Sequence, residues 1–361
     1  MKRLLVLLAA SSMILGLSAC ATATATQAPQ PIAEEPRYAT SAPMPTAAPE
    51  YLPPENYAAP TIAVPAPNNG MDNYFQDYGV NPFTSSERDH LSTFGLDVDT
   101  ASYEITRSYI RDGALPPMDA VRAEEFINAF DQGYAAPQDA AFTLYADGGP
   151  SPFVQPGNVL LRFGVQGYRV SDFERKPFNL TFVIDASGSM GQDNRLGLVQ
   201  DSLRLLVDRL DERDTITIVA YSEDAWLVLQ PTNASDRRTI QRAINQLYPT
   251  NTTNLDAGLR LGYQYAYRTL NPNAVNRVIL CSDGVANQGN IDANPILDYV
   301  QGYVDSGITL TGIGVGMGNY NDVLLEQLAD RGDGNYYYVD TSEQAREVFV
   351  ENLTATMQVI A

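Results

Sequence analysis

The sequence predicts an α/β protein with a doubly wound, parallel β-sheet in its carboxyl-terminal half. Short apolar runs with no polar face, such as residues 182–184 and 278–281, are typical of strands that helices cover on both sides. Between these runs, apolar residues recur at helical spacing. Strands that alternate with helices favour parallel pairing through right-handed crossovers.

Residues 1–20 have the pattern of an export signal. Lys2 and Arg3 form a basic start, and residues 4–17 form an apolar segment that is too short to span a bilayer as a stable helix. Small residues then precede Cys20, an arrangement that resembles a bacterial lipoprotein signal and implies cleavage before Cys20 and its acylation, as by palmitate. We expect lipid anchoring outside the cytoplasm, on the cell membrane or outer membrane. The alternative is a plain secretory signal with an incidental cysteine.

Residues 21–86 predict a disordered tether. The segment is rich in Ala, Pro and Thr and has few larger aliphatic residues, so it cannot bury enough apolar surface to offset the entropy of ordering. Its prolines favour extended polyproline II conformations. Near its end, Tyr74, Phe75 and Tyr78 are expected to dock on the folded part of the chain; contact with a partner is the alternative.

Residues 87–177 predict a smaller α+β region, an amino-terminal extension of the main domain. Its expected elements are a strand at 93–99, helices at 101–111 and 119–130, and strands at 142–146 and 158–167. The apolar residues expected to face inward from the second helix are Val121, Phe126, Ile127 and Phe130.

Residues 178–361 predict the main α/β domain. Its expected strands are 180–185, 214–221, 275–281, 307–315 and 335–339, with an edge strand at 225–230 that turns back beside its predecessor. The expected helices are 195–210, 236–247 with Ser235 as a possible cap, 255–270, 295–305, 322–330 and 342–357.

Oxygen-bearing side chains follow the first buried strand of this domain. Asp185, Ser187 and Ser189 stand at alternating positions where the strand ends, and Gly188 allows a tight turn among them. In open α/β sheets, ligands collect at the carboxyl ends of the strands. Carboxylate and hydroxyl oxygens suit Mg²⁺ or Mn²⁺, which prefer six oxygen ligands.

Two later segments supply further oxygen ligands. Thr253 lies in a polar loop that precedes a helix, and Asp283 follows the buried run 278–281. Asp-x-Ser-x-Ser, then Thr, then Asp-Gly in this order resembles the metal-ion-dependent adhesion site of von Willebrand factor type A domains, which have a Rossmann-like fold. The sequence departs from the family at Thr252, where the family usually has glycine. The resemblance implies five metal ligands: Asp185 and Asp283, directly or through water, and the hydroxyls of Ser187, Ser189 and Thr253.

The extension adds a second resemblance. Residues 94–103 and 121–128 are similar to the region that precedes the type A domain in a subgroup of bacterial lipoproteins. Asp97-x-Asp99 also suggests the nucleophile loop of haloacid dehalogenase-type phosphatases, but that pattern requires threonine where Ala101 stands. A helix capped by Thr100 or Asp99 is the favoured interpretation.

Composition disfavours several classes of function. The formal net charge of −20 argues against nucleic acid as a partner. His90, the only histidine in the chain, lies far in sequence from Cys281 and from the Ser187 loop, so nucleophilic catalysis lacks its usual base. Cys281 is expected in the core.

We therefore expect a non-enzymatic binding protein. The resemblance implies a bound metal that engages an Asp or Glu of a protein partner, as in cell adhesion. The alternatives are a metal-dependent hydrolase of the cell envelope and a structural tether with an unused site.

Overall fold

The computed structural model describes residues 73–76, 79, 85, 87–93, 95–153, 158–171, 174–284, 293–318 and 320–352. The predicted signal at 1–20 with Cys20, and most of the predicted tether at 21–86, lie outside these residues. Within the described part of the chain, every helix is too short or too polar to cross a membrane.

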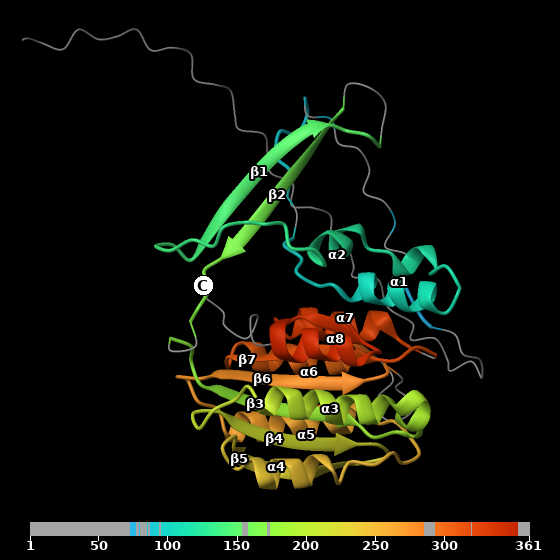
Figure 1. Cartoon of the computed structure of the whole chain (residues 1–361), viewed down its shortest axis with the longest axis vertical. Coiled ribbons are helices and arrows are strands. Elements are labelled where there is room, and N and C mark those ends of the chain that lie inside the picture. The colour runs from blue at the N-terminus through green and yellow to red at the C-terminus, as the bar shows by residue number, and fades with distance from the viewer. Residues whose placement is uncertain are drawn as a thin grey trace, which may run out of the picture. The chain divides into compact units, whose positions relative to one another are not determined.

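A six-stranded sheet forms the centre of the main domain, in the order β5-β4-β3-β6-β7-β8 (Figure 1). All neighbouring strands are parallel except β5, which runs antiparallel to β4 at one edge. This mixed, mainly parallel sheet confirms the predicted fold class. The strands are β3 (Phe178–Asp185), β4 (Thr215–Tyr221), β5 (Ala225–Asn233), β6 (Val275–Ser282), β7 (Ile308–Val315) and β8 (Tyr336–Val339).

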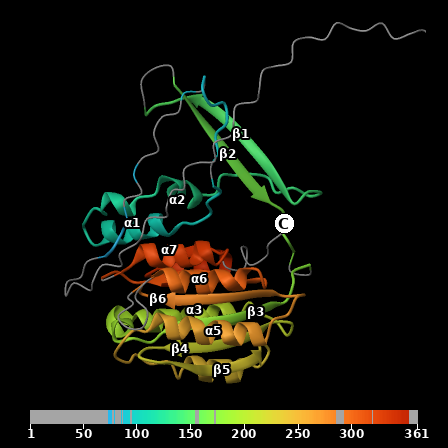
Figure 2. The same cartoon turned by 180° about the vertical axis from the view of Figure 1, so that it is seen from behind.

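Helices cover both faces of this sheet (Figures 1 and 2). The core on one face contains side chains of α3, α4 and α8, and the core on the other face contains side chains of α5, α6 and α7. The helical segments are η2 (Gly188–Asn194), α3 (Arg195–Val207), α4 (Arg237–Ile244), α5 (Leu255–Arg268), α6 (Ala293–Val304), α7 (Asp322–Arg331), α8 (Ser342–Arg346) and η3 (Glu347–Asn352).

Two helix predictions in the main domain need correction. The side chain of Asp236, and not that of Ser235, caps α4 by accepting a hydrogen bond from the amide of Thr239. The long closing helix predicted from residue 342 is also wrong in part, because α8 ends at Arg346 and the chain continues as the π-helical segment η3.

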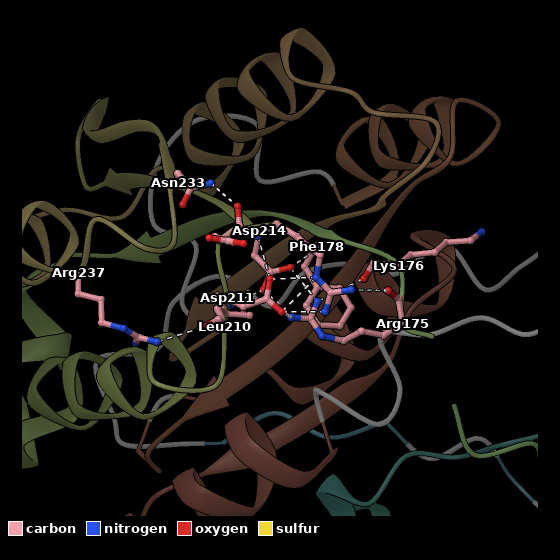
Figure 3. Close-up of polar contacts among 10 residues, drawn as sticks. Arg175, Lys176, Phe178, Leu210, Asp211, Asp214, Asn233 and Arg237 are labelled. Atoms are coloured by element: carbon pink, nitrogen blue, oxygen red, sulfur yellow. Dashed lines mark hydrogen bonds and ion pairs between the residues drawn. The ribbon is translucent and has the colours of Figure 1, made fainter. Parts of the chain in front are cut away.

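A buried ion pair fixes the amino ends of β3 and β4 (Figure 3). The guanidinium of Arg175 donates to both carboxylate oxygens of Asp214, at 2.8 Å each. One of these oxygens also accepts a hydrogen bond, at 2.9 Å, from the amide of Phe178, which is the first residue of β3. A two-pronged pair of this kind fixes orientation as well as distance, so β3 enters the sheet in a defined register.

The amino-terminal extension consists of α1 (Ala101–Arg111), η1 (Met118–Ala120), α2 (Ala123–Asn128), β1 (Phe142–Pro150) and β2 (Val159–Gly167). Three predictions for it are wrong. The described residues of 93–99 form no strand, the helix predicted at 119–130 is broken between η1 and α2, and no side chain caps α1. Three residues predicted to face inward from the broken helix are exposed: Val121, Ile127 and Phe130.

The end of the predicted tether docks on the main domain. Tyr74 pairs with Asn321 as an isolated parallel bridge, and Phe75 packs against the core that contains α5–α7. Asn73 accepts hydrogen bonds from the amides of Gly318 and Tyr320. The prediction that these aromatics dock is confirmed for Tyr74 and Phe75, whereas Tyr78 lies outside the described residues.

Candidate metal centre

Neighbouring parallel strands bring Asp185 and Asp283 to the same edge of the sheet. Asp185 ends β3, and Asp283 follows directly after β6. In the register of these strands Ile184 pairs with Cys281, so the next residues, Asp185 and Ser282, also meet. The Ser282 hydroxyl donates to Oδ2 of Asp185 at 2.9 Å, and both aspartates are fully buried.

The loop after β3 turns its hydroxyls towards one another. The amide of Ser187 donates to Oδ1 of Asp185 at 2.8 Å. The hydroxyl oxygens of Ser187 and Ser189 lie 3.0 Å apart. Ser187 is buried and Ser189 is half-buried. The Asp-x-Ser-x-Ser motif therefore forms one compact group of oxygen atoms.

The loop before α5 packs against this group. The amide of Thr250 donates to the carbonyl of Ala186 at 2.7 Å, and the amide of Gly188 donates to the carbonyl of Asn251 at 3.3 Å. A Cβ atom at position 188 would lie 2.9 Å from the carbonyl oxygen of Thr250. Glycine is needed here because the two loops approach so closely.

Thr253, in the same loop, has a buried hydroxyl that could serve as a metal ligand. Its side chain is 1% exposed, and its hydroxyl has no hydrogen-bond partner among the described residues. A buried hydroxyl without a partner costs free energy, so such groups are rare unless an ion or water satisfies them.

Asp283 has a cationic partner that the sequence did not reveal. Arg195, at the start of α3, donates through Nη1 to Oδ2 of Asp283 at 3.0 Å and through Nη2 to the carbonyl of Met317. Its side chain is nearly completely buried. The guanidinium offsets part of the negative charge at the site and fixes the position of the Asp283 carboxylate.

Burial destabilises the ionised form of the Asp185 carboxylate. Burial, together with the nearby charge of Asp283, raises the pKa of Asp185 to about 7. The Tyr221 hydroxyl donates to Oδ2 of Asp185 at 3.2 Å, and burial raises the pKa of that phenol. A divalent cation would favour the ionised form of both carboxylates.

The chemistry of these groups fits Mg²⁺ or Mn²⁺. Both ions prefer oxygen ligands, and the site offers two carboxylates and three hydroxyls. No group of three or more His, Cys, Asp or Glu side chains suited to a metal occurs in the described residues. A metal at this site would therefore depend on the serine and threonine hydroxyls as well as on the two aspartates.

The groups needed for nucleophilic catalysis are not assembled in the described part of the chain. Cys281 is fully buried within β6, where burial raises the pKa of its thiol. His90 is exposed and lies in the described stretch 87–93, which forms no helix or strand.

The family comparisons identify both folded parts of the chain. Residues 179–351 match the model of the von Willebrand factor type A domain, and residues 69–162 match a second model, described as von Willebrand factor. Residues 179–351 form a von Willebrand factor type A domain. Type A domains commonly bind protein partners, in many cases through metal-dependent sites.

Two curated relatives match half or more of this chain. YfbK of Escherichia coli is 36% identical over 312 residues, which cover 84% of this chain and 54% of YfbK. The protein sll0103 of Synechocystis is 31% identical over 191 residues, covering 52% of this chain and 44% of that protein. The chain thus spans about half the length of these relatives. A solved type A structure from Catenulispora acidiphila has a TM-score of 0.45 and 18% identity, covering 63% of this chain and 52% of that one.

Proposed function

We propose that this chain binds Mg²⁺ or Mn²⁺ at the edge of its type A domain and uses the ion to engage a protein partner. The ligands would be Asp185, Ser187, Ser189, Thr253 and Asp283. The ion supplies a positive charge and a coordination position for an Asp or Glu side chain of the partner. Recognition would be adhesive and not catalytic.

The buried Thr253 hydroxyl carries this proposal. It lies in a loop that hydrogen-bonds to Ala186 and Gly188, next to the Asp-x-Ser-x-Ser motif. The alternative, a site without a metal, leaves that hydroxyl without a partner among the described residues, and Arg195 then offsets only part of the negative charge of the two buried carboxylates. The net charge of −20 adds support, because a bound cation would be a rare positive centre for an acidic partner group.

Other residues of the chain would hold the ligands in place. Ser282 and Tyr221 donate to one oxygen of Asp185, and the amide of Ser187 donates to the other. Arg195 fixes Asp283. Such supporting hydrogen bonds orient metal ligands and tune their affinity.

Calorimetric titration of the full chain with Mg²⁺ and with Mn²⁺ tests the metal site. We expect saturable binding with one ion per chain, and a loss of at least about tenfold in affinity for Asp185→Asn. Asp224→Asn is the control, since it removes the same charge from an exposed turn. Equal affinity in all three proteins would overturn the proposal.

Partner recognition is tested by capture from the native membrane with a crosslinker. In Mg²⁺, the wild-type chain and the Asp224→Asn variant should capture the same partner proteins. These partners should not be captured in EDTA, nor by Asp185→Asn. Capture that survives EDTA would rule out metal-mediated recognition.

A catalytic role makes a different prediction. The proposed binding protein should show no phosphatase or peptidase turnover in Mn²⁺. Turnover that is lost in Asp185→Asn but kept in Asp224→Asn would instead favour a metal-dependent hydrolase.

We further propose that a lipid on Cys20 holds the chain on the outer side of a cell membrane. The support is the basic and apolar sequence that precedes this cysteine. In a detergent phase separation, the mature chain should enter the detergent phase and Cys20→Ser should remain in the aqueous phase. Equal partition of the two proteins would contradict lipid anchoring.

A further inference from the structure

The hairpin of β1 and β2 has two chemically distinct faces. The strands are antiparallel, with Leu144 opposite Val165 and Asp147 opposite Arg162. Two residues directly opposite each other point to the same face, and successive opposite pairs point alternately to one face and the other. One face has no ionisable side chain, and its large residues are Phe142, Leu144, Val159, Leu161, Phe163 and Val165.

The segment that contains Tyr134 packs on part of the other face. Tyr134 stacks on Tyr145 with ring centroids 4.5 Å apart, and its ring packs directly over Gly164. Arg162 forms an ion pair with Asp147 at 2.6 Å and lies over the Tyr134 ring. These contacts fix which face of the hairpin points away from the segment that contains Tyr134.

The apolar face remains accessible to solvent. Its six large side chains are between 39% and 69% exposed. A two-stranded hairpin is marginally stable alone, and strands normally bury an apolar face against another layer. A contiguous, exposed patch of large apolar side chains usually marks an interaction site.

We propose that the apolar face of the β1–β2 hairpin is the interface between two copies of this chain, packed sheet against sheet. Each face offers on the order of 500 Å² of apolar surface, so two would bury roughly 1,000 Å², the lower limit for a specific interface. The net charge of the chain also favours self-association through the apolar face. Two chains of net charge −20 repel each other, and the repulsion is weakest where the contact surface has no ionisable group.

The shape of the face suits a twofold arrangement. Ala146 lies opposite Phe163 near the middle of the hairpin, which places a small side chain beside a large one. Under a twofold axis that runs between the two sheets at this point, parallel to the strands, the large residue of one copy would lie over the small residue of the other. Aligned packing of two sheets, about 10 Å apart, interlocks side chains in this way.

Two adjacent leucines provide a matched test. Leu161 lies on the apolar face and is 62% exposed, and Leu160 lies on the opposite face and is 49% exposed. Sedimentation equilibrium of the full chain should show a reversible dimer. Leu161→Glu should raise its dissociation constant at least about tenfold, because each dimer would bury two new charges, and Leu160→Glu should change it by less than about threefold. A wild-type chain that stays monomeric, or equal effects of the two substitutions, would overturn the proposal.

A crosslinking test does not depend on either leucine variant. Ala146→Cys places a thiol near the proposed axis, and Gln166→Cys places one on the opposite face. Because residues on two sheets about 10 Å apart are too distant for a disulfide, the probe is a bismaleimide that spans about 10 Å. With this crosslinker, Ala146→Cys should form a covalent dimer several-fold faster than Gln166→Cys. Equal rates, or a crosslink that joins the Ala146→Cys variant to a different polypeptide in place of a second copy, would contradict dimerisation through this face.

Discussion

The hydroxyls of Thr252 and Thr253 are both buried without a hydrogen-bond partner among the described residues, but only Thr253 matches the ligand pattern. We predict that Thr253→Val lowers Mg²⁺ affinity at least about tenfold and that Thr252→Val leaves it within about twofold. Neither should change the metal-free free energy of unfolding by more than about 1 kcal/mol, because no protein hydrogen bond is lost. Calorimetry and urea denaturation measure the two effects. An equal loss of affinity in both variants would argue against Thr253 as a ligand.

Asp99 should make stability depend on pH. Its carboxylate accepts the amide of Tyr336 at 2.9 Å, and burial raises its pKa from 3.8 to about 8. Because the folded state favours the protonated form of Asp99, protonation of this carboxyl stabilises the fold. This contribution is fully present below a pH of about 4 and is lost as the pH rises to about 8.

The variant Asp99→Asn should remove this loss. We predict that it is more stable than the wild type at pH 9, by about 3 kcal/mol, and differs little at pH 4. Urea denaturation across this pH range measures the difference, and the exposed Asp139→Asn serves as control. A wild type that gains stability from pH 4 to pH 8 relative to Asp99→Asn would contradict the prediction.

At the level of single residues, the sequence identifies the candidate metal ligands better than it identifies the residues that hydrogen-bond or pair with them. Asp185, Ser187 and Ser189 are close in sequence, so a strand followed by a tight turn predicts their proximity. The ion pair of Arg195 with Asp283 joins residues 88 positions apart. The sequence marks Arg195 only as the start of a helix, and nothing nearby shows which carboxylate it meets.

At the level of secondary structure, the extension is held to the type A domain by ion pairs. Arg122, just before α2, donates to Asp322 of α7 at 2.6 Å and also contacts Glu125. All three side chains are at most 10% exposed. Removing one partner from a buried pair leaves an uncompensated charge in a poorly solvated place.

We predict that Arg122→Leu lowers the free energy of unfolding by about 3 kcal/mol or more. The control is Arg107→Leu, because Arg107 is 55% exposed and its ion pair lies within α1, so its loss should cost less than about 1 kcal/mol. Urea denaturation of the full chain measures the loss of unfolding free energy in each variant. Equal effects would show that the Arg122 contacts do not hold the extension in place.

The strands and helices of the sheet were predictable because burial imposes a clear pattern on them. Each residue of β3 and of β8 is buried, and apolar spacing marks α3 and α5. The extension gave weaker signals. Residues 93–99 have a strand-like pattern but find no strand to pair with in the described part of the chain, and the apolar residues near α2 remain exposed. Their burial would depend on contacts that a sequence pattern does not show.

At the level of the whole molecule, metal binding should stabilise the fold. A ligand that binds only the folded state at about 100 times its dissociation constant adds about 2.7 kcal/mol. For a domain of this size we predict that Mg²⁺ raises the Tm by roughly 5–10 °C. Differential scanning calorimetry should show this rise for the wild type, its reversal by EDTA, and its absence in Asp185→Asn. The same rise in Asp185→Asn would locate the metal elsewhere.

Anomalous diffraction from crystals grown with Mn²⁺ would test the metal centre most directly. We predict one strong peak at the edge of the sheet, within coordination distance of the hydroxyls of Ser187, Ser189 and Thr253 and close to the carboxylates of Asp185 and Asp283. A peak at another place on the molecule, or no peak at saturating Mn²⁺, would contradict the account.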